Sequence, residues 1–180
     1  MKLKKLTIMS VLVAISAVLT LVVKIPFPTA PFLIYEPGDV PILIGGMLFG
    51  PVAALAMTVT ISILLGFFVP SGGVFGVIMH IIATSLLTVP AAMIYRGTKK
   101  SAYKGLMAGA LAMTVVMPLL NVWLNPIFYG MPREAVVKLL VPAIIPFNFL
   151  KSFINAAITA VLIPRMSFWW QKNLADVAKR

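Results

Sequence analysis

The amino-acid sequence predicts an all-α integral membrane protein with six transmembrane helices and both termini inside the cell. Three observations favour this fold class. Of the 180 residues, 61% are hydrophobic and only 11% are charged, whereas a soluble domain carries about a quarter charged residues. Long uncharged stretches separate the basic residues. The lysines and arginines also gather in alternate connecting segments, as they do in multi-pass membrane proteins.

The uncharged stretches predict the helix bounds. A helix needs about 20 apolar residues to cross a bilayer core, and the stretch between Lys5 and Lys24 predicts a first span over residues 6–23. Gly and Pro residues divide the charge-free run from Val40 to Tyr95. The further helices are expected over residues 39–49, 52–69, 74–95, 105–125 and 138–164 of a single domain covering residues 1–180. The helix over 39–49 is too short to cross the whole core.

Basic residues predict the orientation, because lysine and arginine near span ends are retained in the cytoplasm. With the N-terminus inside, the cytoplasmic segments hold eleven of the 15 basic residues. These are Lys2, Lys4, Lys5, Arg96, Lys99, Lys100, Lys104, Arg165, Lys172, Lys179 and Arg180. The net charge of +11 is therefore explained by topology. Since the basic residues are not gathered on one solvated face, no nucleic-acid partner is expected.

The composition argues against several function classes. The chain has no cysteine, one histidine and four acidic residues, too few for the usual zinc, iron–sulfur or multi-carboxylate centres. It contains no GxxxxGK[ST] phosphate-binding loop. A membrane enzyme acting on lipids needs acids, histidines or a nucleophile at one depth, and a stand-alone transporter usually shows internal repeats. Neither pattern is evident, so we expect no enzyme activity, metal or cofactor.

The expected sixth helix carries the clearest candidate binding residues. Asn148, Lys151 and Asn155 are spaced i, i+3 and i+7, so they project from one helix face. An ionisable group inside a span is costly unless it faces protein or water, which favours a ligand site. A structural hydrogen-bond cluster or a lysine extending to the interface is the alternative. Because the acids lie outside the spans, we expect ligand groups, amides or water to partner Lys151.

Three further polar residues are weaker candidates. Asn121 lies near the outer end of the expected fifth helix, where loop chemistry competes with ligand contact. His80 and Thr84 are one turn apart on the expected fourth helix. A lone histidine on an apolar helix commonly serves packing, and it cannot form a metal site by itself. Packing and ligand contact are therefore both open for these residues.

The segment over residues 24–38 is rich in proline and large apolar side chains. Proline removes backbone donors and stiffens the chain, so we expect an ordered external loop without regular structure. Phe32, Leu33 and Tyr35 make this loop a candidate lid over a ligand. The alternative is that its aromatic rings anchor in lipid headgroups.

Four stretches of the chain together resemble the substrate-binding S components of energy-coupling factor (ECF) vitamin transporters, in the riboflavin-specific branch. They are EPGDVPILIGGMLFGP at 36–51, LLN at 119–121, FYGMP at 128–132 and PAIIPFNFLK at 142–151. The resemblance covers nearly the whole chain. It implies a six-helix membrane protein that captures a vitamin from outside. It also implies partners that drive transport, namely a transmembrane coupling protein (EcfT-type) and two ABC ATPases.

The resemblance also implies roles for individual residues. The positions that lie at the flavin in riboflavin-binding relatives match Asn121, Asn148 and Lys151, and the covering loop matches residues 31–35. Polar contacts on the third and fourth helices of the relatives are missing here or replaced by His80 and Thr84. The small residues that meet the coupling protein match Ser10, Ala14 and Ala17.

The implied cargo and location follow from the same resemblance. Riboflavin is the expected cargo, with pantothenate or a pyridoxine-type vitamin as the alternative. The expected location is the plasma membrane of a prokaryote.

Overall fold

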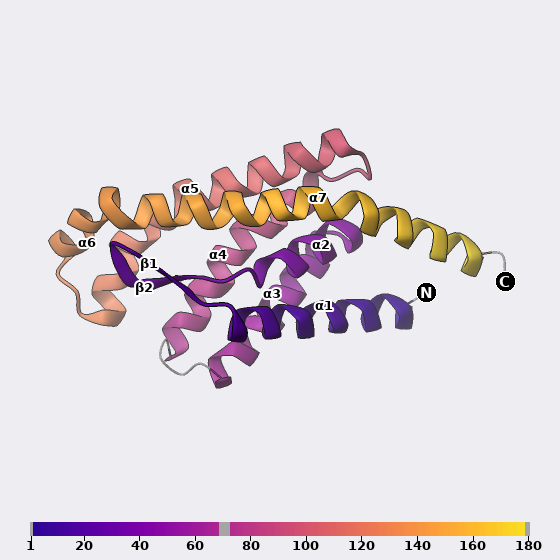
Figure 1. The fold of residues 1–180 in the computed structure, drawn as a ribbon. Coiled ribbons are helices and arrows are strands. Elements are labelled where there is room, and N and C mark those ends of the chain that lie inside the picture. The colour runs from indigo at the N-terminus through magenta and orange to yellow at the C-terminus, as the bar shows by residue number, and fades with distance from the viewer. Residues whose placement is uncertain (1, 69–72, 179–180) are drawn as a thin grey trace.

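The computed structural model describes residues 2–68 and 73–178, which form a helical bundle with one small hairpin (Figure 1). The elements are α1 (Lys2–Val22), β1 (Ile25–Phe27), β2 (Ala30–Tyr35), α2 (Asp39–Phe49), α3 (Pro51–Phe68), α4 (Gly73–Ile94), α5 (Lys99–Tyr129), α6 (Arg133–Leu139), the π-helical turn η2 (Leu140–Ile144) and α7 (Ile145–Ala178). Among the described residues, five helical segments are long and apolar enough to cross a membrane, and α2 is shorter. The expected all-α membrane fold is thus confirmed.

Two of the expected helices have bounds that differ clearly from the sequence-based expectation. Helix α5 begins at Lys99 rather than at residue 105, because Thr98 and Ser101 form a capping box, and it ends where Gly130 adopts a left-handed conformation. The last helical segment begins at Arg133 rather than 138 and continues to residue 178. Residues 69–72, which include the expected end of the third helix, lie outside the described residues, as do 179 and 180.

The short helix α2 lies at the centre of the bundle. It contacts α1, α3, α4 and α7, and every residue from Asp39 to Met47 is buried. One apolar cluster joins α2 to α4, α5 and α7, and a second joins α2 to α1 and α3. Because the neighbouring helices surround α2 with apolar side chains, α2 is stable inside the bundle without being long enough to cross the bilayer.

Small residues allow α4 and α5 to approach closely. A Cβ atom built on Gly105 would lie 2.7 Å from the carbonyl oxygen of Ala91, and one built on Gly109 would meet the backbone of Leu87. The Gly105/Gly109 spacing therefore serves packing within this chain. This is the use that small residues at four-residue spacing have in membrane helices.

The segment over residues 24–38 contains an antiparallel hairpin, so the expectation of an irregular loop was wrong. Ile25 pairs with Tyr35 and Pro26 with Ile34, and the register shifts after Pro26. A two-stranded ribbon tolerates proline, since each strand is an edge and a bulge relieves the missing donor. The regular structure therefore coexists with the prolines of this segment.

The hairpin is fixed to the start of α7. Pro146 has no N–H, so the carbonyl oxygen four residues earlier, on Pro142, lacks its usual helical donor. The Thr29 hydroxyl donates to that oxygen at 2.8 Å. Phe27 adds an edge-to-face contact with Phe147, with ring centroids 5.7 Å apart. Because Pro146 cannot donate to it, the carbonyl oxygen of Pro142 is available to accept the hydrogen bond that holds the hairpin.

The two ends of the bundle differ. The hairpin and α6 lie at one end, and the start of α1 and the last turns of α7 lie at the other (Figure 1). At the second end, Lys5 Nζ donates to the carbonyl oxygen of Phe49 at 3.2 Å. The Phe49 ring packs edge-to-face on Trp170. These contacts tie α1, α2 and α7 together on the side opposite the hairpin.

Candidate functional site

A cavity of about 290 Å³ lies beside the hairpin, close to the lower limit of about 300 Å³ for typical small-molecule sites. Helices α3, α4, α5 and α7 and strand β2 all contribute to its wall. Most lining residues are apolar or glycine. The polar and charged lining residues are Thr20, Glu36, Ser62, His80, Asn121, Asn148 and Lys151.

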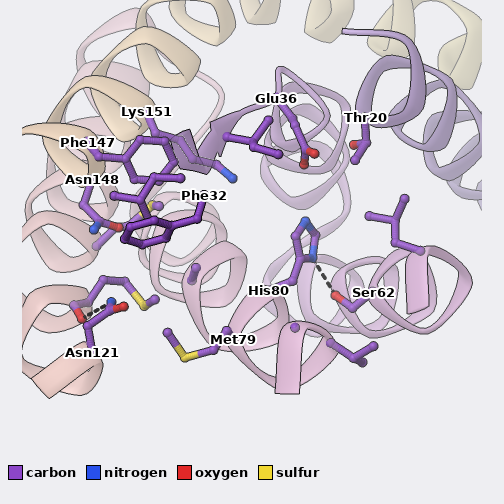
Figure 2. A pocket seen from close by; sticks show the side chains of 18 of the residues that line it. Thr20, Phe32, Glu36, Ser62, Met79, His80, Asn121, Phe147, Asn148 and Lys151 are labelled. Atoms are coloured by element: carbon purple, nitrogen blue, oxygen red, sulfur yellow. Dashed lines mark hydrogen bonds between the residues drawn. The ribbon is translucent and has the colours of Figure 1, made fainter. Parts of the chain in front are cut away.

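Helices α5 and α7 form the polar side of the cavity. Figure 2 shows Asn121, Asn148 and Lys151 on the same side, with Phe147 beside them. Each asparagine amide donates to the carbonyl oxygen four residues earlier in the chain, Asn121 to Met117 and Asn148 to Ile144, both at 2.8 Å. These bonds fix both side chains, and the Asn121 oxygen also accepts from the Asn125 amide at 3.1 Å. Each asparagine keeps a second N–H, and Asn148 keeps its amide oxygen, for further hydrogen bonds.

Lys151 has a charged partner that the sequence did not predict. Its ammonium lies 3.7 Å from Asp39 Oδ2, and Asp39 is 2% exposed. The expectation that ligand groups or water compensate Lys151 was therefore wrong, because the first residue of α2 supplies a buried carboxylate. The distance exceeds that of a good hydrogen bond. The two charges compensate each other, and the lysine N–H groups keep donor capacity on the cavity side.

Asp39 also accepts hydrogen bonds from two other helices. Thr84 of α4 donates to Oδ1 at 2.8 Å, and Asn155 of α7 donates to Oδ2 at 3.2 Å. The Tyr35 hydroxyl donates to Asn155 Oδ1 at 3.0 Å. One carboxylate therefore connects α2, α4 and α7, and Asn155 extends this hydrogen-bond chain to strand β2.

His80 lies across the cavity from the asparagines, next to α3 (Figure 2). Its Nδ1 is 2.7 Å from the Ser62 hydroxyl, and its Nε2 is 4.0 Å from Asp39 Oδ1. Both ring nitrogens thus have polar neighbours. His80 is a fixed part of the wall rather than an isolated packing residue.

Glu36, between β2 and α2, brings a carboxyl group to the cavity wall, in front of the buried Asp39 that does not line it. Burial raises the pKa of Glu36 above its usual value, and the positive charge of Lys151 opposes that rise. The negative charge of Asp39 adds to the rise, and Lys24 opposes it. Sequence reasoning did not single out either acid, because both were placed in the external segments of the topology.

Six of the nine expected ligand-binding residues line the cavity, namely Phe32, Leu33, His80, Asn121, Asn148 and Lys151. Thr84, Asn155 and Tyr35 are not among the lining residues and belong to the hydrogen-bond chain behind the wall. Phe32 is 59% exposed although it borders the cavity. Its ring is thus free to pack against a bound molecule.

The residues expected to meet a partner lie along α1. Ser10 and Ala14 are exposed, and Ala17 is half-buried against the cluster formed with α2 and α3. Nearby apolar side chains, among them Val11, Ile15 and Val18, are exposed as well. This helix therefore presents a surface of small and aliphatic side chains away from the bundle.

Comparisons with known proteins agree on one family. A family profile described as "ECF transporter, substrate-specific component" matches residues 4–163. The riboflavin transporter FmnP of Bacillus subtilis is 28% identical over 187 aligned positions, which cover 96% of this chain and 97% of the relative. The riboflavin transporter RibU of Staphylococcus aureus is 30% identical over 173 positions, covering 91% of this chain and 90% of the relative.

A solved structure, reported as the S component of a bacterial ECF transporter, superposes with a TM-score of 0.76 at 30% identity and full coverage of both chains. The family and its relatives are transporter components rather than enzymes. S components bind a vitamin substrate and work with an ECF module. The cavity beside the hairpin and the multi-pass helical fold fit that task. The chain therefore belongs to the family of substrate-specific components of ECF transporters.

Proposed function

We propose that this protein binds riboflavin in the cavity beside the hairpin and is the riboflavin-specific component of an ECF-type importer. The observation that carries the proposal is the division of the cavity wall. Asn121, Asn148 and Lys151 bring hydrogen-bonding groups to one side, and most of the remaining wall is apolar or glycine. A flavin has the matching chemistry, with apolar ring faces and a polar ring edge. The two riboflavin transporters among the relatives support the same cargo.

The lysine–aspartate pair argues against an anionic vitamin such as pantothenate. A carboxylate ligand would gain most from an uncompensated lysine, whereas Lys151 already has a buried counter-ion in Asp39. An uncharged ligand needs only the lysine N–H donors. Riboflavin meets this condition.

We propose that the full importer adds an EcfT-type coupling protein and two ABC ATPases in the plasma membrane of a prokaryote. The face of α1 that bears Ser10, Ala14 and Ala17 is the proposed contact for the coupling protein. The proposed orientation places both termini in the cytoplasm and the hairpin outside. Single cysteines replacing Lys172 and Arg133 test it with an impermeant thiol reagent on intact cells. We expect labelling at position 133 alone, and labelling at 172 alone would reverse the orientation.

Copurification tests the cargo directly. The protein is purified in detergent from cells grown with riboflavin, and bound small molecules are identified by absorbance and mass spectrometry. We expect a yellow preparation with a flavin spectrum and, after removal of the ligand, saturable riboflavin binding by titration calorimetry. A different vitamin in the preparation, combined with no riboflavin binding by the emptied protein, would refute riboflavin as the cargo.

A further inference from the structure

We propose that Asp39, which lies behind the cavity wall, is a positioning residue that makes the cavity select an uncharged ligand over an anionic one. This inference rests on the proposed function for the ring system that the cavity holds, and it adds the residue that sets the tolerated charge. It concerns a side chain that does not line the cavity. Asp39 therefore acts through the groups that do.

The position of Asp39 gives it control over two lining residues from different helices. Its Oδ2 faces the ammonium of Lys151 on α7 at 3.7 Å, and its Oδ1 faces the imidazole of His80 on α4 at 4.0 Å. Hydrogen bonds from Thr84 and Asn155 hold the carboxylate itself. Because the carboxylate is held from both sides, it gives the lysine ammonium and the histidine ring a negative neighbour in a fixed position.

The charges around the cavity explain the selection. With a neutral imidazole at His80, Lys151 and Asp39 cancel each other, and Glu36 adds negative charge whenever it is ionised. An entering phosphate or carboxylate thus meets no net positive charge from the lysine–aspartate pair, although it must leave water. Lys24, which does not line the cavity, faces Glu36 and is offset by it when that carboxyl is ionised. Charge interactions are much stronger in buried, low-dielectric surroundings than in bulk water, so this balance discriminates strongly. An uncharged ligand still receives hydrogen bonds from Lys151.

Asp39→Asn removes this charge while keeping the shape of the side chain. The new amide oxygen can accept the Thr84 hydrogen bond. If the Asn155 amide turns over, its oxygen accepts from the new amide nitrogen, and its nitrogen donates to the Tyr35 oxygen. The hydrogen-bond chain is then preserved, and Lys151 has lost its counter-ion.

The test compares riboflavin with riboflavin 5′-phosphate, which carries the same ring system and adds a dianionic group at the end of its sugar-alcohol chain, so the comparison measures the charge balance of the whole cavity. Affinities of both are measured by titration calorimetry for the wild type and Asp39→Asn. We expect the wild type to bind riboflavin more tightly. In Asp39→Asn, the ratio of the two affinities should shift toward the phosphate by at least about tenfold. A purely structural role would weaken both ligands by the same factor, and that result would overturn the inference, as would a shift toward riboflavin.

The double variant Asp39→Asn/Lys151→Met keeps the inference testable if the single variant folds poorly. Removing one partner of a buried pair is more damaging than removing both. The double variant should therefore melt at a higher temperature than Lys151→Met, and its affinity ratio should return to the wild-type preference for riboflavin. A double variant that melts below both single variants would show that the pair does not act as a unit. Failure of the wild type to bind either flavin would instead refute the proposed function.

Discussion

The two sides of the cavity are built on different principles. The side formed by α5 and α7 carries polar groups that internal bonds hold in place, as the contacts of Asn148 and Lys151 show. The side formed by α3 and α4 carries Leu65, Val77 and the glycines 66, 73 and 76, with His80 and Ser62 as its polar pair. The hydrogen-bonding groups of the first side can orient a ligand, and the small residues of the second side leave room for it. On the proposed function, binding specificity depends on both sides, through separate residues that can be changed independently.

The largest expected effect comes from filling the space on the α4 side. Gly76 lines the cavity, and a Cβ atom built there meets no atom within 4 Å. Gly76→Leu should therefore fold, since its Cβ atom meets no neighbour and leucine raises helix propensity, but the rest of its side chain should occupy the ligand volume. We expect riboflavin affinity to fall by roughly a hundredfold or more, in line with overpacking costs of about 1–3 kcal/mol or more. Titration calorimetry measures the loss.

A second variant controls for a new leucine on this helix. Val74→Leu lies on the same helix at an exposed position outside the cavity wall, and it should leave both melting temperature and affinity unchanged. If Gly76→Leu binds riboflavin as tightly as this control, the glycines are not the source of the ligand space. The assignment of the ligand space to the α3 and α4 side of the cavity would then be wrong.

A smaller effect is expected on the α7 side. Asn148→Leu removes the amide that borders the cavity while keeping a similar volume. Losing one hydrogen-bonding group to a buried ligand costs about 1–2 kcal/mol, which is roughly a five- to thirtyfold loss in affinity. Calorimetry with riboflavin gives the comparison.

Ser152→Ala is the control on the same helix. Ser152 is fully buried, donates to the carbonyl oxygen of Phe149 and does not line the cavity. It should change melting temperature without changing affinity. Equal affinity losses in Asn148→Leu and Ser152→Ala would assign Asn148 to helix packing.

Much of the polar side was predictable from the sequence, because helical periodicity places residues on faces. The i, i+3 and i+7 spacing of Asn148, Lys151 and Asn155 holds in α7, although only the first two reach the cavity. Asn155 points to Asp39 and Tyr35 instead. Periodicity fixes the face of a helix, but it does not say whether a cavity or a neighbouring helix lies opposite.

The pairing of Lys151 with Asp39 could not be read from the same pattern. The two residues are far apart in the chain. Because Asp39 begins a helix that is too short to span the bilayer, the sequence suggests that its carboxylate lies at the membrane surface. Burial arises only because α2 is enclosed by its neighbours. From the sequence alone, Lys151 is a lone charge, and its replacement by an apolar residue would be expected to cost little stability. The structure predicts destabilisation instead, since Asp39 would be left uncompensated.

The smallest expected effect concerns Glu36, which lines the cavity and, when ionised, adds negative charge near Lys151 and Asp39. Because burial raises the pKa of Glu36 in the folded protein, the folded state binds this proton more tightly than the unfolded state does. Its contribution to stability is therefore complete below the usual value of 4.5 and is lost as the pH rises through the raised pKa. Glu36→Gln cannot titrate and lacks this loss.

The measurement is the difference in melting temperature between Glu36→Gln and the wild type, both without ligand, between about pH 4 and pH 8. All other titrating groups are shared, so their effects largely cancel in the difference. We expect the difference to increase in favour of Glu36→Gln as the pH rises above 4.5 and then to level off. A difference that is constant with pH would mean that Glu36 is as well solvated in the folded state as in the unfolded state. A difference that decreases with pH would mean that the positive charges of Lys151 and Lys24 outweigh burial. The surroundings of Glu36 and Lys151 would then favour anions more than their geometry implies.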